Sequence, residues 1–196
     1  MAEAVTGLIL AGGLARRMGG GDKGLRPFRG LPLIAHAIAR LRDQVDTLII
    51  NANQNLEAYR ALGYPVIADA VSASVEAYAG PLAGVHAGLS ACATPLLVTV
   101  PCDSPMLPLD LVARLREALV AAGAELAVAR SASGLQSVCS LYRRGVVDRL
   151  TTHLERGGRK VDGWHAELNV VRVDFADEAA FVNINTLAEL EELQQP

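Results

Sequence analysis

Residues 7–23 read GLILAGGLARRMGGGDK, an apolar segment that runs directly into a glycine-rich loop. The part before Ala11 is almost wholly apolar, which is typical of a buried strand in a parallel sheet. Glycines allow the loop backbone to approach a bulky anion with its N–H groups exposed. Arg16, Arg17 and Lys23 add cations that match the charge of a phosphate chain. This stretch therefore predicts a site for a nucleoside triphosphate.

Length and composition limit the class of protein. The chain has 196 residues, of which 51% are hydrophobic, 20% charged and 4% aromatic, so we expect one α/β domain packed with aliphatic side chains. A formal net charge of −3 argues against general binding to nucleic acid or to a membrane surface. Three cysteines without disulfide or zinc spacing favour a cytoplasmic location. The first apolar run ends at Gly12, too early for a signal peptide or a membrane span.

Short apolar segments alternate with helical patterns along the chain. The expected strands are 5–10, 47–50, 66–68, 95–100 and 126–129, and the expected helices are 33–41, 56–62, 81–92 and 109–122. This alternation predicts a Rossmann-like α/β fold: one domain with a mainly parallel, twisted sheet and helices on both faces. Further strands are expected at 138–142 and 170–174, with helices on both sides of Gly157. Residues 186–189 have the capping-box pattern that begins a last helix.

Polar features follow four of the expected strands. The glycine loop follows the first strand, Asn51 and Asn53 follow the second, Asp69 follows the third and Asp103 follows the fourth. A polar residue after one strand is ordinary turn chemistry. Polar features after all four favour a ligand site, because doubly wound sheets bind ligands at the carboxyl ends of their strands.

Asp103 is the strongest metal candidate. It lies one residue beyond an apolar strand, where a carboxylate is costly to bury unless it is paired or bound to a metal. Mg²⁺ prefers one or two carboxylates, with phosphate oxygens and water as its other ligands. The structural alternative is a cap for the helix after Pro108.

Two known glycine motifs fit the loop poorly. Gly19, Gly21 and Gly24 match GxGxxG, but a dinucleotide fold needs that motif directly after the strand, and here it begins about nine residues late. A Walker A loop is disfavoured because Lys23 follows Asp22 rather than glycine. An ordinary surface loop remains the structural alternative.

The other candidate residues give weaker signals. The four histidines, His36, His86, His153 and His165, show no metal or triad spacing, so we expect solvated or helix-capping roles for them. Residues 156–160, RGGRK, suit a second anion or a plain turn between helices. Asn183 and Asn185 alternate about one apolar residue, so that both amides can face one side; Asn185 can equally mark the end of a strand.

Taken together, these motifs carry a family resemblance. Members of one family share five motifs that this chain matches in order. They are LAGGxxxRMGGxDK at 10–23, NAN at 51–53, GPLAG at 80–84, PCD[ST]P at 101–105 and FVN[IV]NT at 181–186. The chain thus resembles the molybdenum cofactor guanylyltransferases, which have the GT-A-like nucleotidyltransferase fold. The first motif alone marks a wider superfamily, whereas the full set is far more specific. Gly21 fills the variable position before Asp22, which makes this loop more flexible.

The resemblance implies transfer of GMP from GTP to the terminal phosphate of molybdenum-molybdopterin, with release of pyrophosphate. It implies GTP contacts at Leu10, Ala11, Gly12, Gly13, Lys23, Asn51, Asp69 and Asp103, and acceptor contacts at Arg17, Arg159, Asn183 and Asn185. It implies catalytic roles for Lys23, Arg17 and Asp103, with Asp103 as the Mg²⁺ ligand. The nucleotide-binding part is then expected at about 1–110 and the acceptor-binding part at about 111–196.

Other functions remain possible at this point. Cytidylyltransferases of the same cofactor usually read LAAG and lack GPLAG, so Gly12, Gly13 and residues 80–84 favour guanine. Another nucleotidyltransferase is a broader alternative. A GTP-binding regulatory module without turnover is disfavoured by the intact Lys23 and Asp103. We expect a monomer whose partners are GTP and molybdenum-molybdopterin. Protein partners would be molybdopterin-handling proteins, molybdoenzymes or their chaperones.

Overall fold

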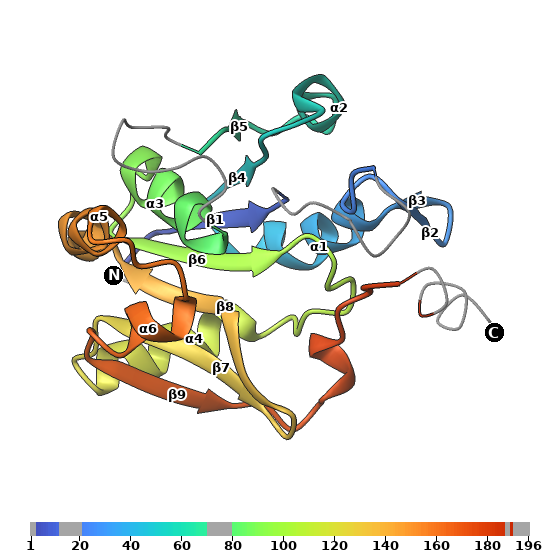
Figure 1. Ribbon diagram of the computed structural model, residues 1–196. Helices are drawn as coiled ribbons and strands as arrows, with labels where there is room; N and C mark the ends of the chain where they lie inside the picture. Colours follow the sequence, from blue (N-terminus) through green and yellow to red (C-terminus); the bar gives the residue numbers. More distant parts are fainter. Residues whose placement is uncertain (1–2, 12–20, 70–79, 187–188, 190–196) are drawn as a thin grey trace.

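A seven-stranded sheet with strand order β5-β4-β1-β6-β8-β7-β9 forms the centre of the protein (Figure 1). The computed structural model describes residues 3–11, 21–69, 80–186 and 189. The strands of the sheet are β1 (Val5–Leu10), β4 (Thr47–Asn51), β5 (Val66–Ile67), β6 (Leu96–Pro101), β7 (Leu126–Ser131), β8 (Gly134–Arg143) and β9 (Val170–Asp174). A separate hairpin pairs β2 (Pro27–Phe28) with β3 (Leu31–Pro32).

The sheet is mainly parallel, as the sequence predicts. Strands β5, β4, β1 and β6 run parallel to one another, and β9 runs parallel to β7. Strand β8 is antiparallel to both of its neighbours. Its direction follows from the two-residue turn 132–133 after β7, because so short a connection can join only antiparallel strands.

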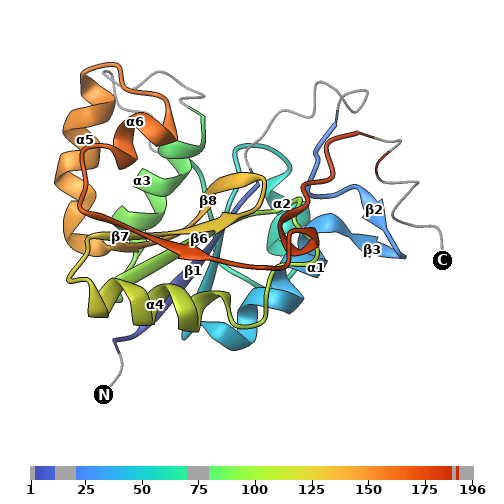
Figure 2. The same ribbon diagram turned by 90° about the horizontal axis from the view of Figure 1, so that it is seen from below.

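Helices cover both faces of the sheet (Figure 2). Each face has its own apolar core. The helices are α1 (Leu33–Leu41), α2 (Leu56–Arg60), α3 (Pro81–Ala91), α4 (Leu111–Ala121), α5 (Val147–Glu155) and α6 (Val161–His165). Apolar residues of α1 and α4 pack on one face, and those of α3, α5 and α6 pack on the other. The predicted strands and helices up to residue 174 are therefore confirmed to within a few residues at their ends. None of the helices in the described ranges is long and apolar enough to cross a membrane.

The carboxyl ends of β1, β4, β5 and β6 meet at one edge of the sheet. Leu10 is in register with Asn51 on one side and with Pro101 on the other. Backbone hydrogen bonds extend this register past the strands, from Ala11 N to Asn51 O at 2.8 Å and from Cys102 N to Leu10 O at 3.1 Å. The segments that follow these strands are thereby held next to one another, which is what the strand-end rule requires of a ligand site.

Candidate active site

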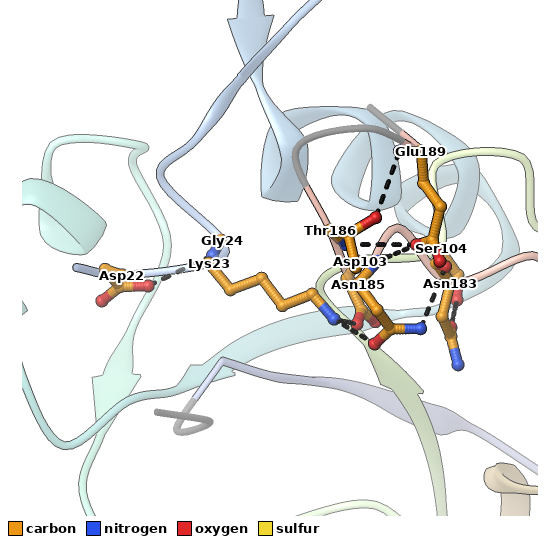
Figure 3. A network of polar contacts seen from close by, with 9 residues as sticks. All are labelled: Asp22, Lys23, Gly24, Asp103, Ser104, Asn183, Asn185, Thr186 and Glu189. Atoms are coloured by element: carbon orange, nitrogen blue, oxygen red, sulfur yellow. Dashed lines mark hydrogen bonds and ion pairs between the residues drawn. The ribbon is translucent and has the colours of Figure 1, made fainter. Parts of the chain in front are cut away.

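Lys23 connects two distant segments of the chain at this edge. Its ammonium group donates hydrogen bonds to the carboxylate of Asp103 and, at 2.7 Å, to Oδ1 of Asn185 (Figure 3). The side chains of Lys23 and Asp103 are only 16% and 12% exposed, so the pair offsets the cost of burying either charge. The carboxylate of Asp103 is thus paired, while its expected role as the Mg²⁺ ligand stays a prediction. Its alternative role as a helix cap is wrong, because α4 has its N-cap at Asp110.

Residues 183–185 are fastened to the turn that carries Asp103. The backbone N–H of Ile184 donates to Asp103 O at 3.0 Å, and the Ile184 side chain is fully buried. Ser104 Oγ donates to Asn183 Oδ1 at 2.5 Å. Asn183 and Asn185 are exposed on either side of the buried isoleucine, and neither belongs to a strand. The interpretation of Asn185 as the end of a strand is therefore wrong.

The predicted capping box holds this segment from the other side. Glu189 Oε2 accepts hydrogen bonds from the backbone N–H groups of Asn185 at 2.6 Å and Thr186 at 3.1 Å. Thr186 Oγ1 in turn accepts the N–H of Glu189 at 3.2 Å. These reciprocal bonds confirm the capping-box prediction. The other residues of the last helix that the sequence predicts lie outside the described ranges.

Asn51, Asn53 and Asp69 form a second polar group. Asp69 Oδ1 accepts Asn51 Nδ2 at 2.9 Å, and Asp69 Oδ2 accepts Asn53 Nδ2 at 2.8 Å. The backbone N–H of Asp69 donates to Asn53 Oδ1 at 2.9 Å. The structure therefore brings together the polar residues that follow two neighbouring strands.

Gly84 on α3 makes room for this second group. A Cβ atom at position 84 would overlap the side chains of Asn51 and Leu10. Asn51 is only 2% exposed and so has little space into which it can move. The GPLAG stretch, whose Pro81 begins α3, thus lets the helix approach the end of β4 closely.

The backbone around Lys23 is anchored by a contact that sequence reasoning missed. The Tyr59 hydroxyl donates to Asp22, whose carboxylate also accepts Gly24 N and Asn55 Nδ2, both at 3.2 Å. Burial, together with the hydrogen bond to Asp22, raises the pKa of Tyr59, so the phenol stays protonated. A Cβ at Gly24 would lie 2.6 Å from the Tyr59 oxygen. The adjacent Asp22 and Lys23 in the first motif were visible in the sequence. No local pattern indicated that Tyr59 on α2 would bond Asp22.

Other expected site residues are placed in part. Ala11 is buried beside Asn51, with Leu10 directly before it. Gly12, Gly13 and Arg17 lie outside the described ranges. Arg159 donates to the backbone carbonyls of Leu154 and Gly158, both at 2.8 Å. Within the described segments, no hydrogen bond joins Arg159 to either of the two asparagines near Lys23.

Comparison with known proteins agrees with this architecture. The family model described as MobA-like NTP transferase domain matches residues 7–168. The chain belongs to the MobA-like NTP transferase family. A molybdenum cofactor guanylyltransferase of Ralstonia nicotianae is 51% identical, covering 97% of this chain and 96% of that protein. One of Cupriavidus taiwanensis is 52% identical, covering 95% and 94%.

Solved structures of low sequence identity share the fold of this MobA-like transferase. Molybdopterin-guanine dinucleotide biosynthesis protein A of Archaeoglobus fulgidus aligns with a TM-score of 0.78 at 22% identity, covering 96% of both chains. A CMP:2-keto-3-deoxy-manno-octonic acid synthetase complexed with CTP aligns with a TM-score of 0.76 at 14% identity, covering 97% of both. The predicted α/β nucleotidyltransferase fold is thus confirmed.

The described part of this MobA-like transferase offers one carboxylate beside Lys23 rather than a cluster of metal ligands. Among the described residues, no three His, Cys, Asp or Glu side chains gather into a metal site. Asp103 is a single buried carboxylate, and in the described part of the chain its bond to Lys23 uses only Oδ2. One carboxylate is compatible with Mg²⁺, which takes its remaining ligands from phosphate and water.

Within the described part of the chain, no cysteine or histidine bonds the Lys23 ammonium, although Cys102 directly precedes Asp103 and lies close to Gly24. The cysteines are free and buried, and burial raises the pKa of the Cys139 thiol to about 12. The expectation of solvated or capping histidines is wrong for His165, which is 7% exposed and bonds the Tyr142 hydroxyl at 2.7 Å. It is also wrong for His153, whose side chain is 10% exposed and which pairs with Glu167 at 2.7 Å. Both lie in or beside the apolar core around Trp164, which periodicity alone did not reveal.

Proposed function

We propose that this transferase moves GMP from GTP to the terminal phosphate of molybdenum-molybdopterin and releases pyrophosphate. Relatives named molybdenum cofactor guanylyltransferase, at about half identical residues over nearly the whole chain, support the activity. The observation that carries the mechanism is the shielded contact of Lys23 with Asp103 and Asn185. It places a fixed cation between the nucleotide motifs and the C-terminal segment.

The proposed mechanism is positioning and charge stabilisation. A phosphate nucleophile is already ionised near neutral pH, so the step needs no general base. Bond making and breaking occur at the α-phosphorus of GTP, and negative charge builds on the leaving pyrophosphate. Lys23 would oppose that charge from a preorganised position, with Arg17 as a second cation. Because Lys23 is already held by two oxygens, little reorganisation is needed before the step.

The nucleotide is proposed to lie along the carboxyl ends of β1, β4 and β5. Gly12 and Gly13 would offer backbone N–H groups to the nucleotide. Leu10 and Ala11 would line its site, since the Ala11 N–H is already bonded to Asn51 O. The Asn51–Asp69 pair would contact it from the neighbouring strands, since those two side chains are already fixed to each other at 2.9 Å.

Asp103 is proposed to hold Mg²⁺. The carboxylate lies next to Lys23, so a metal there and the lysine would act on the same phosphates. When bound, Mg²⁺ supplies charge neutralisation at phosphate oxygens. The position of Asp103 is set by the chain itself, through its carbonyl bond to Ile184.

The acceptor is proposed to meet Asn183, Asn185, Arg159 and Arg17. The first three follow the boundary that we propose near residue 110 between nucleotide-binding and acceptor-binding parts, whereas Arg17 precedes it. The Lys23–Asn185 contact crosses that boundary, so the two parts share one side-chain cluster. We further propose a cytoplasmic monomer, a location that fits three free, buried cysteines. Its product would pass to molybdoenzymes or their chaperones.

One experiment separates this function from its rivals. Binding of GTP, CTP, ATP and UTP is measured with Mg²⁺, and pyrophosphate release is then followed with and without molybdenum-molybdopterin. We expect GTP to bind best and pyrophosphate to appear only when the acceptor is present. Preference for CTP would indicate a cytidylyltransferase, which the shared fold with a CTP-binding synthetase makes a relevant control. GTP binding without release would indicate a regulatory module.

A further inference from the structure

We infer that Ser104 is a positioning residue that turns the amide of Asn183 so that Nδ2 donates to an oxygen of the acceptor substrate. This inference rests on the proposed function. It assigns a role to a residue of the PCDSP segment that the mechanism above does not use. The chemistry recognised is an oxygen that accepts a hydrogen bond, from either the phosphate or the pterin carbonyl.

The contact joins a buried hydroxyl to an exposed amide. Ser104 is 1% exposed, whereas Asn183 lies on the surface. Ser104 Oγ donates to Asn183 Oδ1 at 2.5 Å, and Figure 3 shows the amide nitrogen of Asn183 pointing away from the serine. Because the Asn183 amide oxygen is occupied by Ser104 Oγ, the amide presents only its NH₂ group outward. Hydrogen bonds within the described segments leave that group for a ligand.

Both ends of this contact are fixed by the backbone. The carbonyl of Asp103, directly before Ser104, accepts the N–H of Ile184, directly after Asn183, at 3.0 Å. Ile184 is fully buried, so the two segments move together. Asn185 Nδ2 donates to Asn183 O at 3.2 Å and restrains the same backbone from the other side. A hydroxyl held in this way can fix the rotamer of an exposed side chain.

The outward atom of the Asn183 side chain is a donor, which selects the ligand chemistry. Asn183 Nδ2 points outward as a donor, and the ammonium of Lys23 lies nearby on Asn185. Such a surface favours oxygens and disfavours N–H groups. Fixing the amide before binding lowers the entropy cost of ordering it, so the gain appears as acceptor affinity. GTP affinity should not show this gain, because GTP is proposed to bind at the carboxyl ends of β1, β4 and β5.

The test compares five variants with the wild type in the guanylyl-transfer assay. They are S104A, N183A, N183D, the double variant S104A/N183A, and the control S140A. Ser140 is a fully buried serine on β8 whose Oγ donates to Ser137 O at 2.9 Å, so S140A makes the same chemical change away from Asn183. The readouts are KM for molybdopterin, Kd for GTP, kcat and thermal stability.

We expect S104A to raise KM for molybdopterin by about five- to tenfold, with Kd for GTP within about twofold. S140A should leave both constants unchanged. N183D should be worse than N183A, because Ser104 still fixes the side chain while an oxygen replaces the outward donor and repels phosphate. S104A should add nothing further in the N183A background, since the serine acts only through that amide.

Several results would overturn the inference. They are a molybdopterin KM for S104A within twofold of wild type, a better acceptor KM for N183D than for N183A, or a full additional S104A effect in the double variant. If S104A is too unstable to assay, the comparison of N183D with N183A decides alone. Failure of the proposed function looks different, because the wild type itself would then produce no guanine dinucleotide. Competition by inorganic phosphate and by a phosphate-free pterin identifies the source of the oxygen: S104A should weaken one of these two inhibitors, and no change in either contradicts the inference.

Discussion

Lys23 and Asp103 form an ion pair although they lie 80 positions apart in the sequence. Both side chains are mostly shielded from solvent, so each charge depends on the other for compensation. Removing either one leaves the other partly buried without its partner. Substitutions at the two positions are therefore coupled, and their effects should be compared with each other as well as with the wild type.

Asp103→Ala is expected to retain the fold and to lose most turnover. The Asp103 carboxylate caps no described helix and is not part of an apolar core, so the fold should not depend on it. Loss of the proposed metal ligand should cost several kcal/mol at the transition state. The measurement is kcat at limiting and saturating Mg²⁺, alongside circular dichroism. Asp174→Ala is a matched control, because Asp174 pairs with Arg130 on an exposed edge strand. Near wild-type turnover at limiting Mg²⁺ would show that Asp103 is not the ligand.

Lys23→Ala is expected to lower kcat by about 10²–10³, the scale for removing one preorganised stabiliser of developing charge. Lys23→Arg should rescue only in part, since a planar guanidinium replaces a compact ammonium between Asp103 and Asn185. Steady-state kinetics with GTP and the acceptor measure both variants. A change confined to KM would mean that Lys23 holds only the ground state.

Much of the fold was predictable because it is recorded in local patterns. Apolar segments that end in polar residues predicted β1, β4 and β6, and the rule for doubly wound sheets predicted that their ends would meet. The direction of β8 and the small β2–β3 hairpin were not predicted. The first depends on how a short turn places a strand between β6 and β7, and the second consists of two-residue strands too short to show a period.

The candidate site was predictable in its residues more than in its contacts. Asn51, Asp69 and Asp103 follow from strand ends, but the bonds of Tyr59 to Asp22 and of Ser104 to Asn183 join segments that no local pattern connects. The prediction of solvated or capping roles was wrong for His153 and His165 for a related reason. Whether a histidine is solvated depends on which helices pack over it, and α5 and α6 are placed by tertiary contacts.

Asn183→Ala and Arg159→Ala are expected to leave GTP affinity within about threefold, a change of under roughly 1 kcal/mol. Molybdopterin binding or transfer should fall by about tenfold or more, because a polar contact to the acceptor is lost. Isothermal titration of each variant with each substrate makes the comparison. Arg159→Ala should also lower thermal stability, since its guanidinium bonds two carbonyls at the end of α5. Weak GTP binding with intact molybdopterin binding would reverse the proposed division of the site.

Gly84→Ala is expected to weaken GTP binding by displacing Asn51 from Asp69. Its control is Gly88→Ala, one turn further along α3, where a Cβ would overlap Leu8 in the core instead. Both variants should lose thermal stability, because both crowd the contact between helix and sheet. Only Gly84→Ala should also raise Kd for GTP, by about tenfold. Equal GTP affinities in the two variants would remove Asn51 from the nucleotide site.

The last prediction concerns acid stability and His165. Burial lowers the pKa of His165 to about 4 from its ordinary value of 6.5, although nearby Asp162 opposes this. Its Nε2 lies 2.7 Å from the Tyr142 hydroxyl, and a proton on that nitrogen would remove the acceptor. Between pH 6.5 and 4 the unfolded chain binds a proton that the folded protein does not. The free energy of unfolding contributed by this group is therefore complete above pH 6.5 and decreases as the pH falls toward 4, by about 3 kcal/mol in all.

Urea unfolding at pH 7 and pH 4.5 measures this contribution in His165→Gln against the wild type. Glutamine keeps an oxygen that can accept the Tyr142 hydroxyl but does not titrate, so this variant should lose less stability on acidification. His36→Gln is the control, because His36 is half-buried on α1 and bonds Phe28 O at 2.8 Å. The control should show the full wild-type loss. An equal loss in His165→Gln and the wild type would mean that carboxylates, which titrate in the same range, account for the acid sensitivity and that the buried imidazole does not.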